Sequence, residues 1–305
     1  MEQPLAAVEQ PTGTYGFRAM GTDWEVLTCP DDGGAAGARV ERRAVALEAR
    51  FSRFRDDSEL SKVNRRRGEW VVVSAEMFEV VGQALQARER SGGLFDPLLL
   101  EAMVASGYED DFDVGRVVGS SPPPVGGGAI ELDARARRVR LTPDTGLDLG
   151  GFVKGWAVDR LVEEVGDNGV LNAGGDLRAV GPADEGYGWV IGVEDPRYPQ
   201  RDSFLIAAQD EAVATSGINR RHWTAGGVAM HHIIDPRTRR PAETDVVTAT
   251  VIAATCSDAE VAARAALILG SETGVSWLTQ RRLAGVVIRA DGSWVASPAM
   301  AGRFL

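Results

Sequence analysis

The sequence predicts an α+β fold in which mixed or antiparallel sheets pack against helices. Segments with strand-like alternation come in runs, notably between residues 189 and 216, whereas a parallel sheet would need a helix after almost every strand. The 305 residues are 44% hydrophobic and 25% charged, which is typical of a globular chain with a large core. Because no shift in composition divides the chain, we expect a flexible tail over residues 1–14 and a single domain over 15–305.

The first expected elements are a strand and a long helix. Residues 15–29 alternate as a strand does, and Met20-Gly21-Thr22 interrupts them. Residues 35–54 carry apolar side chains at spacings of three and four, which predicts a helix with one face on the core. That face consists of Val40, Ala44, Leu47, Phe51 and Phe54.

A second helix is expected between a short strand and a glycine pair. Residues 69–73 form the strand, Ser74 is the expected N-cap, and the helix runs to about Arg90 before Gly92-Gly93. Asp96-Pro97 then offers an N-cap followed by a proline at the first helical position, which predicts another helix start.

Residues 108–128 contain no core pattern, and we expect them to form a long, mobile surface loop. The two segments after this loop, 129–133 and 137–141, alternate as a hairpin does and lead toward Asp148.

The segment from Asp148 to Asp159 predicts a strand end, a Gly150-Gly151 turn and an amphipathic helix. It contains Lys154, one of two lysines among 33 basic residues. A cation in the first turn of a helix opposes the helix dipole unless an anion lies between them. The segment is therefore either a phosphate site, built from backbone N–H groups and Lys154, or an ordinary turn with a surface lysine.

The C-terminal half is richer in strands. A capping box at Ser257-Asp-Ala-Glu260 predicts a helix, which should end at Gly270, and a final hairpin should span residues 283–297. The strands predicted by alternation cover 169–172, 177–180, 189–194, 203–208, 211–216 and 246–254.

The net charge of −11 disfavours nucleic acid or an anionic membrane surface as a partner. No apolar run approaches the length of a membrane span, and residues 1–14 lack the basic start and apolar centre of a signal peptide. We therefore expect a cytoplasmic protein without membrane insertion. Cys29 and Cys256 lie far apart and are expected to be reduced thiols.

The histidines His222, His231 and His232 fall within eleven residues. Adjacent residues of a strand point to opposite faces, so one of the last two can face a site, where its near-neutral pKa suits a general base. A solvated histidine at the end of a strand is the alternative.

Three carboxylates lie at the ends of expected elements, where they can bind Mg²⁺ together with water and phosphate oxygens. They are Asp148, Asp176 and Asp258. Asp258 has a second interpretation, because a carboxylate in a capping box stabilises the start of a helix.

Seven short motifs, taken in order, resemble the family of ApbE-like FAD:protein FMN transferases. They are Met20-Gly-Thr22, Phe54 with Ser58-Glu-Leu-Ser-Lys-Val-Asn64, Gly93-Leu-Phe-Asp-Pro97, the segment from Asp148 to Asp159, Asn172-Ala-Gly-Gly-Asp176, Thr215-Ser-Gly217 and His232-Ile-Ile-Asp-Pro-Arg-Thr238. The resemblance covers most of the chain and implies an α+β fold that binds FAD and Mg²⁺.

Members of this family cleave the FAD pyrophosphate and attach FMN through a phosphoester bond to a threonine of a target flavoprotein, releasing AMP. The resemblance implies that Lys154 neutralises pyrophosphate charge and that His232 is the base for the threonine hydroxyl. It also implies that Mg²⁺ is held by the backbone carbonyl of Gly151 and the carboxylate of Asp258. The residues implied to contact FAD are Met20, Phe54, Leu94, Phe95, Asp96, Asp148, Lys154 and Ile234.

The chain departs from the family pattern near the expected metal site. The pattern places a threonine four residues after the metal-binding aspartate, and Ala262 follows Asp258 at that spacing. Water can replace one hydroxyl ligand of Mg²⁺, so an Mg²⁺-dependent transferase is our main hypothesis. Two alternatives use the same site. One is an Mg²⁺-dependent FAD pyrophosphatase that yields FMN and AMP, and the other is a non-catalytic FAD-binding protein.

Overall fold

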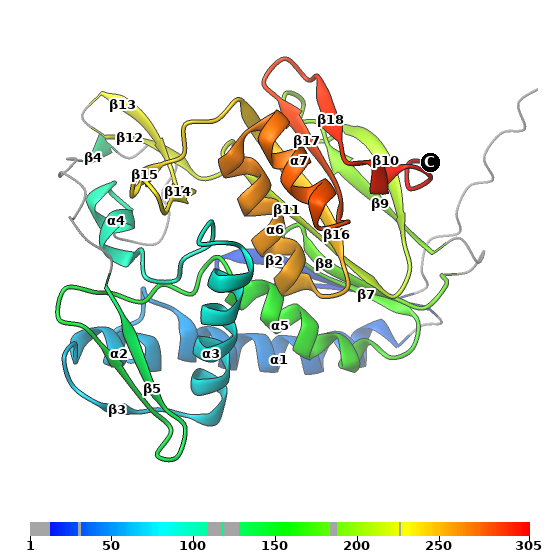
Figure 1. Ribbon diagram of the computed structural model, residues 1–305. Coiled ribbons are helices and arrows are strands. Elements are labelled where there is room, and N and C mark those ends of the chain that lie inside the picture. The colour runs from blue at the N-terminus through cyan, green and yellow to red at the C-terminus, as the bar shows by residue number, and fades with distance from the viewer. Residues whose placement is uncertain (1–12, 30–31, 109–116, 119–127, 184–187, 226) are drawn as a thin grey trace, which may run out of the picture.

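The computed structural model describes residues 13–29, 32–108, 117–118, 128–183, 188–225 and 227–305 (Figure 1). Its centre is an antiparallel sheet, as the sequence predicted. The strand order of this sheet is β1 (Gly13–Ala19), β2 (Thr22–Thr28), β7 (Gly169–Ala173), β8 (Asp176–Val180), β11 (Glu211–Gly217), β16 (Val246–Ala253), β17 (Ala284–Arg289) and β18 (Trp294–Ala296).

Side chains of the central sheet alternate between two cores, because successive residues of a strand point to opposite faces. On β16, Ala249 and Val251 belong to the core under the helices, whereas Ile252 belongs to the opposite one. The helices that cover the first face are α1 (Gly33–Phe51), α5 (Val153–Leu161), α6 (Cys256–Leu269) and α7 (Ser271–Gln280). The hairpin that packs on the second face consists of β9 (Trp189–Glu194) and β10 (Asp202–Ala208).

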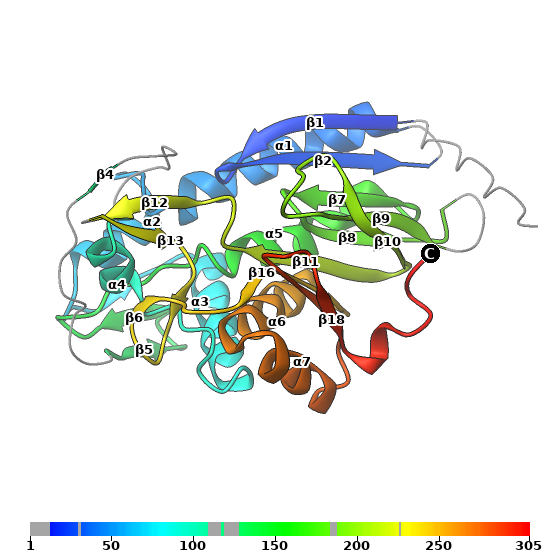
Figure 2. The ribbon, with the colours of Figure 1, turned by 90° about the horizontal axis from the view of Figure 1, so that it is seen from above.

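Several small elements gather at the end of the molecule away from the C-terminus, as both views show (Figures 1 and 2). They are α2 (Glu59–Arg65), α4 (Leu100–Ala105), β3 (Val71–Val72), β4 (Val117–Val118), β5 (Ile130–Asp133), β6 (Arg138–Leu141), β12 (His222–Ala225), β13 (Val228–His231), β14 (Ile234–Asp235) and β15 (Arg240–Pro241). The remaining elements are α3 (Ala75–Arg90) and the short 3₁₀ helices η1 (Val162–Val165) and η2 (Pro298–Met300).

Most elements predicted from the sequence are present. Ser74 caps α3 by accepting a hydrogen bond from the Met77 N–H at 3.1 Å, and α3 ends at Arg90. The interruption at Met20 and Gly21 is the turn of the β1–β2 hairpin, where both residues have positive φ. The hairpins β5–β6 and β17–β18 also form as expected.

Four predicted boundaries were wrong. The N-cap of α6 is Thr255 rather than Ser257, because its hydroxyl accepts the Asp258 N–H at 3.2 Å. Asp96 does not start a helix, since its carboxylate accepts the Leu98 N–H in a local turn and α4 begins only at Leu100. The first helix ends at Phe51 rather than at residue 54.

The fourth boundary is that of the N-terminal tail, since β1 already begins at Gly13 and pairs with β2. The described residues do not include 1–12 or, within the expected loop, 109–116 and 119–127. No helix in the described part of the chain combines the length and the apolar character that a bilayer span requires.

Candidate active site

A pocket of about 1200 Å³ lies between the β1–β2 turn, the start of α5, α6 and the segment from β11 to β14. It brings together residues that are up to 248 positions apart in the sequence, from Gly16 to Arg264. All residues that the sequence predicted as FAD contacts line it, as do His232 and Gly151. Of the predicted site residues, only Asp258 does not.

The crossing of α5 and α6 positions the polar centre of this pocket. The helices meet at Gly155, where a Cβ would lie only 2.8 Å from the backbone of Cys256 and Ser257. Asp159 caps the start of α6 by accepting hydrogen bonds from the N–H groups of Cys256, at 2.7 Å, and Ser257, at 2.9 Å. A residue larger than glycine at position 155 would therefore push α6 away from α5.

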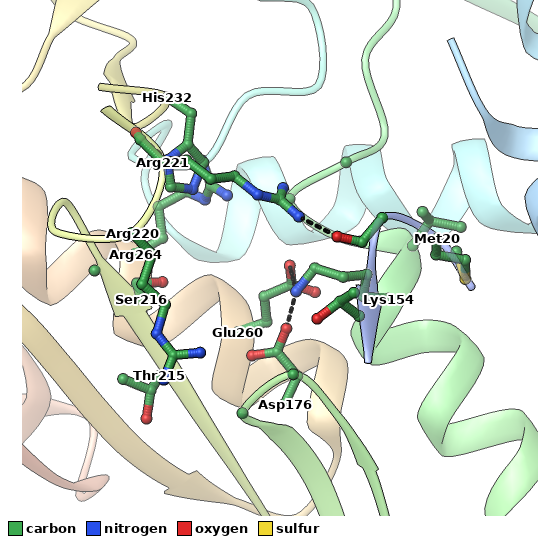
Figure 3. A pocket seen from close by; sticks show the side chains of 18 of the residues that line it. Met20, Lys154, Asp176, Thr215, Ser216, Arg220, Arg221, His232, Glu260 and Arg264 are labelled. Atoms are coloured by element: carbon green, nitrogen blue, oxygen red, sulfur yellow. Dashed lines mark hydrogen bonds and ion pairs between the residues drawn. The ribbon is translucent and has the colours of Figure 1, made fainter. Parts of the chain in front are cut away.

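Lys154, Asp176 and Glu260 form an ionic cluster at this crossing, and Figure 3 shows their side chains pointing toward one another. The Lys154 ammonium forms an ion pair with Asp176 and lies 3.6 Å from a carboxylate oxygen of Glu260. The Lys154 side chain is 18% exposed, while those of Asp176 and Glu260 are 3% and 4% exposed. We call these three residues the Lys154 cluster.

Burial and charges within the Lys154 cluster shift the pKa values of Lys154 and Glu260. Burial alone would lower the pKa of Lys154, but the Asp176 and Glu260 carboxylates raise it above its ordinary value. Burial raises the pKa of Glu260, and Lys154 opposes this effect. The carboxylates of Asp176 and Glu260 therefore supply negative charge beside Lys154 at the start of α5.

The turn between β7 and β8 brings Asp176 into the cluster. Gly174 and Gly175 have φ values of 66° and 98°, and the Asn172 side chain accepts the Gly175 N–H at 2.9 Å. This two-residue turn needs positive φ at both positions, which explains the glycine pair. The segment from Asn172 to Asp176 is thus a tight turn that also places the buried Asp176 carboxylate in the cluster.

Arg264 lies one turn after Glu260 on α6 and also lines the pocket. Its guanidinium faces Gly151, because a Cβ on Gly151 would lie 2.5 Å from the Arg264 Nη2 and 2.7 Å from its Cζ. Within the residues that the structure describes, the buried Arg264 Nε has no hydrogen-bond partner and the guanidinium forms no ion pair. Arg264 therefore presents a permanent positive charge and several N–H groups to a ligand.

His232 faces the same pocket from the segment between β13 and β14, and Figure 3 shows it beside Arg221. Burial, together with the positive charges of Arg264 and Arg221, lowers the pKa of His232 well below its ordinary value. The imidazole is therefore neutral at physiological pH. Its Nδ1 lies 3.4 Å from the Arg221 carbonyl oxygen, which can only accept a hydrogen bond, so Nδ1 carries the hydrogen and the lone pair lies on Nε2.

His231 has a different environment from its neighbour. Its Nε2 lies 3.1 Å from the Ala242 carbonyl oxygen, and its Nδ1 accepts the Ile233 N–H at 3.3 Å. Both ring nitrogens are thus engaged by the backbone. Of the adjacent histidines, His232 faces the pocket, whereas the ring of His231 bonds the backbone beside the end of β13.

An aromatic region forms another part of the pocket. Phe54 is 39% exposed, and the Arg53 guanidinium carbon lies 4.2 Å from the centre of its ring. Arg53 also pairs with Asp148 at 2.9 Å, while the other carboxylate oxygen of Asp148 accepts the Gly150 N–H. An exposed ring held in this way can stack on a planar ligand.

Asp258 lies outside the pocket, so the structure does not bring together Gly151 and Asp258, the two predicted metal ligands. Its side chain is 49% exposed and forms an ion pair with Arg90 at 2.8 Å. It stands two residues before Glu260, and helical residues two apart point in different directions. The carboxylate of α6 that reaches the pocket is Glu260.

Sequence reasoning missed two of the pocket's most important charges, Glu260 and Arg264. A signal for both was present, since they are charged residues four positions apart in a segment that is otherwise mostly alanine, valine, leucine and isoleucine. Charged side chains in a largely buried helix are rare unless they serve a site or are paired.

Comparison with known proteins agrees with this geometry. A sequence profile described as the ApbE family matches residues 20–287. The "FAD:protein FMN transferase" of Treponema pallidum is 30% identical over 257 residues, covering 75% of this chain and 70% of the relative. The protein of the same name from Vibrio cholerae is 27% identical over 296 residues, covering 89% and 86%. The crystal structure of an ApbE protein from Thermotoga maritima superimposes with a TM-score of 0.84 at 27% identity, covering 94% of this chain and 97% of that one.

Proposed function

The chain belongs to the ApbE family, and from this premise we propose that it is an FAD:protein FMN transferase. The family and the α+β fold predicted from the sequence are both confirmed. The observation that carries the proposal is the pocket, where the predicted FAD-contacting residues, among them the partly buried Lys154, lie together with a neutral histidine.

In the proposed reaction, a threonine hydroxyl of the acceptor protein attacks the phosphorus of the FMN half of FAD. A new phosphoester bond forms, the bond between that phosphorus and the bridging oxygen breaks, and AMP leaves. Phosphoryl transfer of this kind depends mainly on positioning and on neutralisation of charge.

Lys154 supports the FAD pyrophosphate in this scheme. Its ammonium has three N–H donors, of which one donates a hydrogen bond to Asp176, while Glu260 forms an ion pair at 3.6 Å. A remaining donor can bind a phosphate oxygen in the pocket. The two carboxylates fix the direction of the ammonium and keep it charged, as the raised pKa of Lys154 indicates.

His232 is the proposed base. Its neutral imidazole has a lone pair on Nε2, which can take the proton of the threonine hydroxyl as the oxygen attacks. The aromatic region around Phe54 is the proposed place of the flavin ring, whose planar system can stack on an exposed phenyl group.

Dependence on Mg²⁺ was predicted through Gly151 and Asp258, and the residues present do not fit that prediction. Asp258 is paired with Arg90 outside the pocket, and Gly151 faces the Arg264 guanidinium. Nowhere in the described ranges do three or more histidine, cysteine or acidic side chains form a group that could hold a metal ion. We therefore assign no step of the reaction to a cation held by Gly151 and Asp258.

Replacing Asp258 by alanine is expected to leave FAD affinity and the response to Mg²⁺ unchanged. The variant loses an exposed ion pair and a favourable charge at the start of α6, which together should cost no more than about 1 kcal/mol. Urea denaturation and FAD titration with and without Mg²⁺ measure these effects. A changed Mg²⁺ requirement would restore Asp258 as a metal ligand.

The function is tested by incubating the protein with FAD, with and without a threonine-bearing acceptor domain. Covalently bound flavin on the acceptor, together with AMP, is the expected result, and an acceptor whose threonine is replaced by alanine is the control. FMN and AMP produced equally well without acceptor would instead indicate an FAD pyrophosphatase. Bound FAD that stays intact would indicate a non-catalytic binding protein. The acceptor flavoprotein and the cytoplasmic location stay predictions.

A further inference from the structure

The position of Arg264 indicates how the proposed transferase neutralises the negative charge of the pyrophosphate. The family pattern described above joins a metal-binding aspartate to a threonine four residues later. In the pocket, the carboxylate of α6 is Glu260, and the residue four positions after it is Arg264. A guanidinium therefore stands at the position where the pattern has a metal-binding hydroxyl.

The space beside Gly151 is filled by this guanidinium. The closeness of Nη2 and Cζ to the ideal Cβ position of Gly151 shows that the planar group packs directly against the glycine backbone. Mg²⁺ demands a near-octahedral shell of oxygen ligands, and a guanidinium supplies donors only. The residue that fills this space is thus a cation itself.

The ion pairs of the Lys154 cluster lead to the same conclusion. Lys154 is paired with Asp176 and lies 3.6 Å from Glu260, so these two carboxylates already offset its positive charge. The charges of the Lys154 cluster pair with one another, whereas Arg264 has neither a hydrogen bond nor an ion pair among the described residues.

We propose that the Arg264 guanidinium takes the place of the divalent cation, binds the FAD pyrophosphate and allows FMN transfer without Mg²⁺ at this site. This inference rests on the proposed transferase function. Arginine suits the role because it stays charged and offers parallel N–H groups that match two phosphate oxygens. The bonds that form and break are those of the proposed reaction, and the hydroxyl proton still goes to His232.

The first arm of the test uses the wild-type protein and does not depend on the folding of a variant. FAD affinity, followed by flavin fluorescence, and flavin transfer to the acceptor are measured in excess EDTA and again with added Mg²⁺. We expect both quantities to agree within about twofold between the two conditions. Transfer that stops in EDTA and returns with Mg²⁺, while FAD remains bound, would overturn the inference and leave the proposed function standing.

The second arm compares two variants that remove the same charge. Arg264→Gln should weaken FAD binding by about 10-fold to 100-fold, because two charge-assisted hydrogen bonds to the pyrophosphate are lost. Arg135→Gln, at an exposed position in the β5–β6 turn, should change it by less than about twofold. Riboflavin, which has no phosphate, should bind Arg264→Gln as well as it binds wild type.

The outcomes separate the role of Arg264 from the proposed transferase function. Equal FAD affinity of Arg264→Gln and Arg135→Gln would overturn the role of Arg264. Weaker riboflavin binding by Arg264→Gln would also overturn it, since the damage would then extend beyond the phosphates. A wild-type protein that binds no FAD with or without Mg²⁺ would overturn the proposed function together with this inference.

Discussion

Replacing Lys154 by alanine is expected to reduce both the stability of the protein and its rate of flavin transfer. The substitution leaves the buried carboxylates of Asp176 and Glu260 without their common cation. Breaking a buried ion pair in this way costs roughly 3–5 kcal/mol, a large share of the stability of an ordinary domain. The loss of a charge that stabilises the reacting phosphoryl group should lower the transfer rate by roughly 10²–10³-fold.

The stability loss should depend on pH in a definite direction. The pKa of Glu260 is already raised above its ordinary 4.5 by burial, and removal of Lys154 should raise it further. The folded variant then binds protons more readily than the unfolded chain, so its stability falls as the pH rises through the interval between 4.5 and the raised pKa. In the wild type, the raised pKa of Lys154 means that its contribution is complete below 10.5 and is lost only in more alkaline solution.

Urea denaturation of Lys154→Ala at about pH 5 and about pH 8 measures this difference, and the larger loss is expected at the higher value. Lys154→Arg retains the charge and should recover most of the stability. The rate of flavin transfer is compared without urea, under conditions in which circular dichroism shows that each variant is folded. A Lys154→Ala protein as stable and as active as the wild type would refute the role of the cluster.

Replacing His232 by glutamine is expected to lower the rate of flavin transfer by roughly 10²–10⁴-fold, the usual contribution of a general base. FAD affinity should change little, because the proposed proton transfer involves the acceptor hydroxyl rather than FAD. The measurement is single-turnover transfer at saturating FAD together with the FAD dissociation constant. Glutamine keeps a polar side chain of similar reach but cannot accept a proton at neutral pH.

The adjacent His231 offers a matched control for this variant. Its ring bonds the backbone at Ala242 and Ile233, so His231→Gln should destabilise the protein without a comparable loss of transfer. The wild-type pH profile gives a second check. Because the pKa of His232 is lowered well below 6.5, transfer should fall with acidification only below that value. Loss of activity already near neutral pH, or equal activity losses in the two variants, would exclude His232 as the base.

Much of the fold follows directly from local sequence patterns. The helix stripe from Val40 to Phe51 and the cap at Ser74 belong to elements whose own residues determine them, and α1 and α3 formed as expected. The glycine pair at Gly174-Gly175 likewise sets its turn through backbone conformation alone. Such features need no information from distant parts of the chain.

Other features depend on contacts that a single sequence does not display. Residues 271–280 carried no predicted element, because Gly270 ends α6 and begins α7 without any connecting loop. The choice between Asp258 and Glu260 as the pocket carboxylate depends on how α6 is rotated about its axis. That rotation is set by Asp159, about a hundred residues earlier in the chain, through its hydrogen bonds to the start of α6.

The close crossing of α5 and α6 at Gly155 has a consequence for the thiol chemistry of the protein. Cys256, the first residue of α6, is fully buried at this crossing, and burial followed by the charges of Asp176 and Asp159 raises its pKa well above 9.0. A thiol in this state is inert toward oxidants and alkylating reagents as long as the helices stay together. Its accessibility therefore reports local opening of the same two helices that carry Lys154 and Arg264, so the chain contains a native probe of the integrity of its own site.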